Sequence, residues 1–183
     1  MKLTPFILLF VGAAWPLRAQ NTDAEVLFVR RISPLFHERC LACHGNDEAK
    51  IKGGLDMRTP AATLKGGDSK KSGFIAGKAE ESPLYLAVTR SHDEWEAMPP
   101  KEADKLRPEQ IAWIKDWIGG GAPWPDEARQ KQIVKANEAK WSSEDGITVK
   151  TTGALSPEWA NRKYKPEGLW AYQPFVKLTR FWY

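Results

Sequence analysis

The chain is poor in the residues from which disulfide frameworks and metal clusters are built, with 2 cysteines, 3 histidines and 3 methionines among 183 residues. It has no block of Lys and Arg interleaved with aromatic residues, and its formal net charge is only +4, so the composition predicts no nucleic-acid partner. Its first apolar run is well short of the ~20 residues that span a bilayer. What remains, 42% hydrophobic and 27% charged residues, is enough for one ordinary globular core and a tail.

Residues 1–19 have the pattern of an export signal. Lys2 supplies a positive start, an apolar stretch covers residues 6–15, and Ala19 ends a plausible cleavage site, with Ala14 as a second cut point. The alternative is an uncleaved membrane anchor. We expect a periplasmic or otherwise exported protein with no membrane span after signal cleavage.

The two cysteines form the motif Cys40-Leu41-Ala42-Cys43-His44. Two thiols one helical turn apart can form thioethers to the two vinyl groups of a haem, and the histidine that follows can place an imidazole nitrogen on the iron. The motif therefore predicts one covalent haem c with His44 as its proximal ligand.

Three other uses of this motif are weaker. A disulfide is the usual role of two cysteines in an exported chain, but it leaves His44 as a bystander. A zinc site lacks a second pair of ligands at the usual spacing. A thioredoxin-like redox motif needs a preceding strand, whereas the pattern before Cys40 is helical.

The sixth ligand of the iron must come from elsewhere, and Met98 is the best candidate. Pro99 and Pro100 restrict the backbone after it, so a thioether can be held at low entropic cost. Met57 is a competitor in a Gly-rich segment shortly after the motif. Two histidines, His37 and His92, are the bis-histidine alternatives.

The rest of the chain predicts an all-helical protein with long Gly-rich loops. The pattern predicts a helix over 23–39, kinked or divided at Pro34, with apolar residues on one face (Ala24, Phe28, Ile32 and Leu35, with Val29 and Phe36 beside them). Residues 46–80 read as loop, Ser82-Pro83 opens a short helix that runs to Arg90, and Pro108-Glu109 opens a helix stopped by residues 119–121. Residues 126–140 are polar and can be helical, and the chain beyond them has isolated tryptophans without periodicity.

Eight landmarks follow one another along the chain: Ile32-Ser33-Pro34-Leu35-Phe36, Cys40-Leu41-Ala42-Cys43-His44-Gly45, Lys52-Gly53-Gly54-Leu55-Asp56, Leu64-Lys65-Gly66-Gly67, Ile75-Ala76-Gly77, Ser82-Pro83-Leu84, Met98-Pro99-Pro100 and the stretch 117–125. With these landmarks in this order, the sequence resembles the planctomycete-type cytochrome c domain from about residue 24 to 125. The resemblance implies a cytochrome c fold, with its first and last helices crossing beside the haem, His44 proximal and Met98 distal.

Gly54 and Leu55 have a role that the residues themselves suggest. The glycine lets the backbone approach the haem edge and the leucine can cover its face, although a simple surface turn explains the pattern equally well. Trp95, Trp113 and Trp117 are expected in the core, where one of them could donate an indole N–H to a haem propionate.

These observations divide the chain into a signal peptide (1–19), a monohaem cytochrome c domain (20–125) and a linker or tail (126–183). The first hypothesis is an electron carrier rather than an enzyme, working with an unidentified redox partner protein. The alternatives are the electron-entry module of a larger oxidoreductase, and a haem peroxidase or sensor with an open sixth position. Residues 169–175 resemble the join to larger domains in that family, so a further domain or an oligomer contact through 126–183 stays open.

Overall fold

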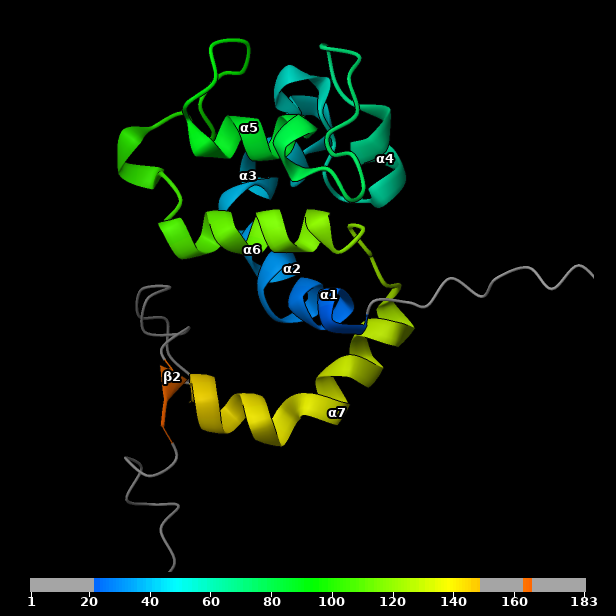
Figure 1. The fold of residues 1–183 in the computed structure, drawn as a ribbon, viewed down its shortest axis with the longest axis vertical. Helices are drawn as coiled ribbons and strands as arrows, with labels where there is room; N and C mark the ends of the chain where they lie inside the picture. The colour runs from blue at the N-terminus through cyan, green and yellow to red at the C-terminus, as the bar shows by residue number, and fades with distance from the viewer. Residues whose placement is uncertain (1–21, 149–162, 166–183) are drawn as a thin grey trace, which may run out of the picture.

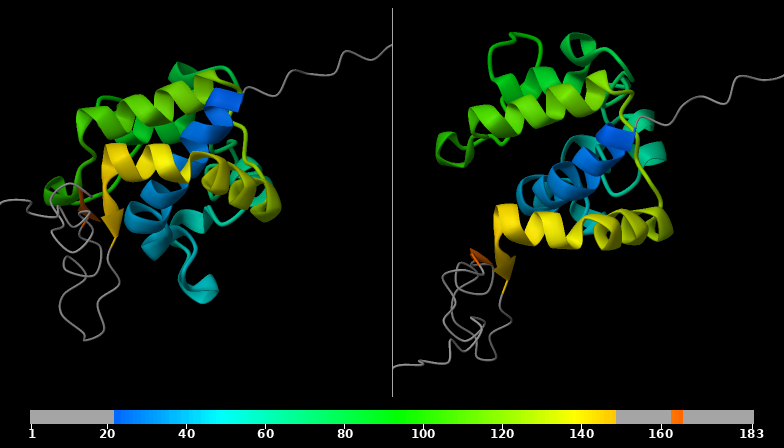
Figure 2. Two further views of the ribbon diagram at one scale, coloured as in Figure 1. Left: turned by 90° about the horizontal axis from the view of Figure 1, so that it is seen from below. Right: turned by 60° about the horizontal axis from the view of Figure 1, so that its bottom comes forward.

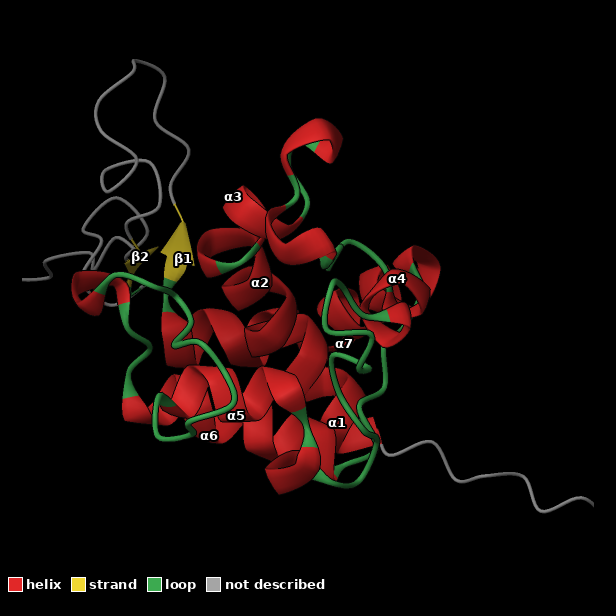
Figure 3. Cartoon of the chain, turned by 90° about the horizontal axis from the view of Figure 1, so that it is seen from above, coloured by secondary structure: helices red, strands yellow, loops and turns green. Residues whose placement is uncertain are grey.

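The computed structural model describes residues 22–148 and 163–165, and this part of the chain is mostly helical (Figures 1 and 3). Its helices, in chain order, are α1 (Thr22–Leu27), the π-helical turn η1 (Phe28–Ile32), α2 (Ser33–Arg39), α3 (Leu41–His44), the 3-10 turns η2 (Glu48–Lys50) and η3 (Lys52–Gly54), α4 (Pro60–Lys65), the 3-10 turn η4 (Ala79–Glu81), α5 (Pro83–Thr89), the 3-10 turn η5 (Glu102–Asp104), α6 (Pro108–Gly119) and α7 (Glu127–Asp145). One antiparallel pair joins β1 (Ile147–Thr148) to β2 (Lys163–Tyr164). The prediction of an all-α protein is confirmed for these residues.

Pro34 divides the first helix, as predicted. A proline inside a helix donates no backbone hydrogen bond and crowds the carbonyl four residues earlier. The chain relieves this crowding with the π turn η1, at whose end the N–H of Ser33 donates to the carbonyl of Phe28, and α2 then continues with Pro34 in its first turn. The predicted apolar face of this helix is buried throughout.

The core lies where α1 and η1 cross α6. Trp117 of α6 is fully buried and lies against three phenylalanines and Trp124, with ring centroids 5.1 to 6.0 Å from its own (Phe28, Phe36 and Phe74). The indole N–H of Trp117 donates to the carbonyl of Pro123 at 2.8 Å, which satisfies its one polar atom and leaves it no role at a propionate. The first and last helices of the predicted domain therefore pack together, as the family resemblance implied, and their place beside a haem stays a prediction.

Helix α7 covers the opposite side of η1 from α6, so that the first helix lies between the two (Figure 2). Only Ile133 of α7 is buried, but Trp141 packs half-buried against the core with the guanidinium of Arg30 over its ring, and charged pairs supply further contacts. The carboxylate of Asp145 binds Arg30 and Arg31, and Arg129 donates to the buried carboxylate of Glu25. The polar stretch at 126–140, which the sequence only allowed to be helical, is thus part of a helix that continues to Asp145 and packs on the helical core.

The prediction that residues 46–80 form one loop is wrong in part. They contain α4, the 3-10 turns η2 and η3, and the start of η4. Thr59 caps helix α4 with its hydroxyl, which accepts the N–H of Ala62, and Pro60 is the first residue of the helix. This Thr-Pro pair is the same start signal that identified the helix at Pro83, but the surrounding glycines concealed it.

The predicted signal peptide, three tryptophans of the tail (Trp159, Trp170 and Trp182) and the join at 169–175 lie outside the described residues. Within the part of the chain that the structure describes, no helix combines the length and the apolar character needed to cross a lipid bilayer.

Candidate cofactor-attachment site

The last four residues of the motif form a single turn of helix, α3, and Cys40 is the residue that joins α2 to it. The N–H of Cys43 donates to the carbonyl of Cys40 at 3.1 Å, and the N–H of His44 donates to the same carbonyl at 2.9 Å. Both cysteines are free thiols, Cys40 half-buried and Cys43 exposed. The turn therefore holds the two thiols and the imidazole close together, as the sequence spacing predicted.

Burial, with a smaller contribution from Cys43, raises the pKa of the Cys40 thiol to about 12. Thioredoxin-like motifs work through a cysteine whose pKa is lowered, and they follow a strand, whereas α2 precedes Cys40. The structure therefore argues against that alternative. For zinc, no three His, Cys, Asp or Glu side chains come together as a metal-binding group in residues 22–148 and 163–165.

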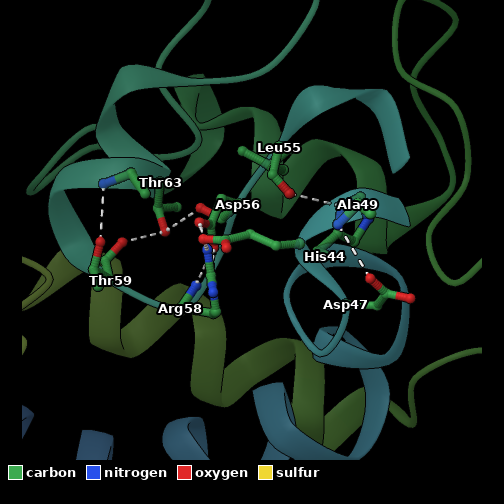
Figure 4. A network of polar contacts seen from close by, with 10 residues as sticks. His44, Asp47, Ala49, Leu55, Asp56, Arg58, Thr59 and Thr63 are labelled. Carbon is green, nitrogen blue, oxygen red and sulfur yellow. Dashed lines mark hydrogen bonds and ion pairs between the residues drawn. The ribbon is translucent and has the colours of Figure 1, made fainter. Parts of the chain in front are cut away.

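The imidazole of His44 has a defined orientation. Its Nδ1 lies 3.1 Å from the carbonyl oxygen of Leu55, and because a carbonyl only accepts, Nδ1 carries the proton and donates (Figure 4). The other nitrogen, Nε2, then has a free lone pair. This hydrogen bond is the usual device by which proteins orient a histidine ligand of a metal and raise its basicity.

The segment that carries Leu55 is fixed on both sides. The N–H of Met57 donates to the carbonyl of His44 at 2.8 Å, which ties the segment directly to the motif. Arg58 binds both carboxylate oxygens of Asp56 and also Glu48, and thereby links the segment to the turn that follows the motif. These contacts lower the pKa of Asp56 and raise that of Arg58. The carbonyl of Leu55 is therefore a preorganised acceptor for His44.

Gly54 is exposed and has a left-handed backbone, with φ +63°. It packs against the neighbouring Gly-rich turn: a Cβ built on it would lie 2.7 Å from Asp68, and a Cβ on Gly67 would lie 2.1 Å from the carbonyl of Gly53. These glycines allow two loops to approach closely, which is the surface-turn interpretation. Their predicted contact with a haem edge stays a prediction, as does the covering role of Leu55, which is half-buried against the core.

Met98 is half-buried and packs against the core, and its N–H donates to the carbonyl of Ala87 in α5 at 3.0 Å. Met57 is almost fully buried and lines a hollow of about 310 Å³ together with Phe36 and Leu41. Met57 also belongs to the core cluster of buried residues, and the alternative that it is the distal ligand stays open. The assignment of Met98 as the distal ligand stays a prediction.

Neither histidine alternative is placed in the core. His37 is exposed on α2, close to the motif in sequence. His92 is exposed in a turn, where its Nδ1 accepts the N–H of Glu94 at 3.2 Å. Sequence reasoning missed Arg90, whose side chain binds the segment after Met98.

The fold and the site define an all-helical protein with a Cys-x-x-Cys-His turn whose histidine is oriented for coordination. Residues 40–102, from the first cysteine of that turn to Glu102, match the family model described as Planctomycete cytochrome C. The resemblance seen in the sequence is confirmed over this segment, which includes both cysteines, His44, Leu55 and Met98. No match was found among curated proteins or solved structures.

Proposed function

We propose that this protein binds one haem c covalently through Cys40 and Cys43 and transfers single electrons. The observation that carries the proposal is the hydrogen bond from His44 to Leu55, which leaves Nε2 of His44 free to coordinate on the same turn that presents both thiols. The match to the cytochrome c family over residues 40–102 supports the same cofactor. The residues present therefore fit the group that the motif implies.

When bound, haem iron supplies a one-electron redox couple whose potential depends on its axial ligands. His44 would hold the proximal position, and the carbonyl of Leu55 would raise its basicity. Met98 is the proposed distal ligand, and its thioether would exclude oxygen or peroxide from that position. This ligand pair favours a carrier over an enzyme, and an open or easily displaced sixth position would favour a peroxidase or sensor.

The compartment and the partner are part of the proposal. The pattern of residues 1–19 and the motif itself support an exported protein, because this cytochrome class is typically exported. A redox partner protein must supply and accept the electrons, either as a separate molecule or as a further domain reached through residues 126–183.

The test is the optical spectrum of the full chain, produced with a c-type maturation system, during a redox titration. We expect the oxidised protein to show the far-red charge-transfer band of a methionine-ligated haem, and Met98→Ala to abolish it. Met57→Ala is the matched control, because it removes a second methionine near the motif, and the band should survive. Loss of the band in Met57→Ala, or its persistence in Met98→Ala, would overturn the ligand assignment.

A further inference from the structure

Arg90 ends α5 with an unusual backbone. Its φ is +58° and its ψ is +21°, in the left-handed region where glycine is the usual residue because a Cβ is penalised there. A residue other than glycine persists in this conformation when the surrounding structure requires it, and such residues occur often at functional sites. The contacts of the Arg90 side chain show what the surrounding structure requires of it.

The guanidinium of Arg90 binds the segment that carries Met98. Its Nη1 donates to the carbonyl oxygen of Pro99, and its Nη2 lies 2.9 Å from a carboxylate oxygen of Glu102 in η5. The side chain of Arg90 is 21% exposed and that of Glu102 is 69% exposed, so the hydrogen bond to Pro99 is the better shielded of the two contacts. Arg90 thus joins the end of α5 to both the residue after Met98 and the turn beyond it.

Two hydrogen bonds therefore hold the backbone around Met98, one at Met98 itself and one at the residue that follows it. The N–H of Met98 is held by the carbonyl of Ala87, inside α5, and the carbonyl of Pro99 is held by Arg90, three residues further along the same helix end. Because Ala87 lies in α5 and Arg90 directly follows that helix, the backbone around Met98 is fixed relative to α5.

We propose that Arg90 is a positioning residue that holds the thioether of Met98 in place as the distal ligand. This inference rests on the proposed function, since it requires a haem with Met98 as its sixth ligand. Without the clamp, Met98 should leave the iron more readily, and an added ligand should take its place.

The experiment measures the affinity of the oxidised, haem-loaded full chain for imidazole, which competes with the methionine. We expect Arg90→Gln and Arg90→Gly to bind imidazole about tenfold more tightly than wild type, the factor that corresponds to one hydrogen bond from a charged donor. Arg90→Gly is the sharper variant, because it also relieves the left-handed backbone. If Arg90 serves only to end the helix, Arg90→Gly leaves the affinity unchanged, and the inference is overturned.

Two controls separate the clamp from charge and from general stability. Lys105 is a second cation that binds Glu102, and its side chain contacts no carbonyl near Met98. The variant Lys105→Gln should therefore bind imidazole with the affinity of wild type. Ile133→Ala weakens the fold at α7, away from this segment, and should also leave the affinity unchanged. An increase in either control equal to that in Arg90→Gln would contradict a local role.

The wild-type spectrum separates failure of this inference from failure of the proposed function. If the methionine band is absent from wild type, the ligand assignment fails before Arg90 is considered. If the band is present and requires Met98, but Arg90→Gln and Arg90→Gly bind imidazole as wild type does, only the positioning role fails.

Discussion

Replacing Asp145 with asparagine should release the end of α7 from the helical core. The carboxylate of Asp145 binds Arg30 and Arg31, with oxygen–nitrogen distances of 2.7 to 2.9 Å, and its side chain is 17% exposed. Hydrogen bonds from Arg30 are the main cause of a pKa lowered from 3.8 to about 2. A decrease of this size corresponds to about 2 kcal/mol, which solvent screening near the surface reduces to about 1–2 kcal/mol.

The pH dependence has a definite sign. Because the pKa of Asp145 is lower in the folded protein than in the unfolded chain, its contribution to stability is complete above about pH 4. It is lost as the pH falls from about 4 to about 2. The difference between wild type and Asp145→Asn should therefore be about 1–2 kcal/mol at pH 7 and should vanish near pH 2.

Urea unfolding of the haem-loaded full chain, followed by helical circular dichroism at several pH values, measures this difference. Glu138→Gln is the matched control, because Glu138 is an exposed acid on the same helix for which the structure gives no ion pair. It should change the free energy of unfolding by less than about 0.5 kcal/mol. Equal stability of Asp145→Asn and wild type at pH 7, or a difference that persists undiminished at pH 2, would refute the reasoning.

Three further predictions concern the fold around the site and are read from the same unfolding curves. Gly67→Ala should strongly destabilise the fold, because the added Cβ would lie 2.1 Å from a backbone carbonyl, whereas Gly119→Ala, with open space around it, should be neutral or stabilising by up to ~1 kcal/mol. Equal effects of the two substitutions would contradict the close approach of the two loops. Trp117→Ala should cost about 3–5 kcal/mol, since it empties the centre of the aromatic cluster, and a cost below 1 kcal/mol would count against that core. In α7, Ile133→Ala should cost about 2–5 kcal/mol and Val134→Ala less than about 1 kcal/mol, because Ile133 is 4% exposed and Val134 is 44% exposed. A larger cost for Val134→Ala than for Ile133→Ala would mean that α7 packs through another face.

The sequence predicted the main helices because their signals are local. The apolar face around Phe28 and Ile32, the proline break, and the helix starts at Pro83 and Pro108 all depend on residues close together in the chain. The attachment turn was predictable for the same reason, since its two thiols and its imidazole lie within five consecutive residues.

The contacts that orient the site were not predictable, because they join residues without a fixed spacing. The acceptor for His44 is a backbone carbonyl, that of Leu55, which any residue could supply. The clamp from Arg90 to Pro99 depends on a left-handed residue at the end of α5, where the sequence offers no glycine as a signal. Helix α7 looked like a polar tail because its packing relies on distant charge pairs, such as that of Arg30 with Asp145, and on only two apolar side chains, the buried Ile133 and the half-buried Trp141.

Covalent attachment of haem to the attachment turn is the central claim, and intact-mass spectrometry of the denatured full chain measures it directly. Wild type, produced with a c-type maturation system, should carry the added mass of one haem that denaturation does not remove. The variant with Cys40→Ala and Cys43→Ala should have the mass of the polypeptide alone. Wild type without the added mass, or the double variant still carrying it, would contradict the account.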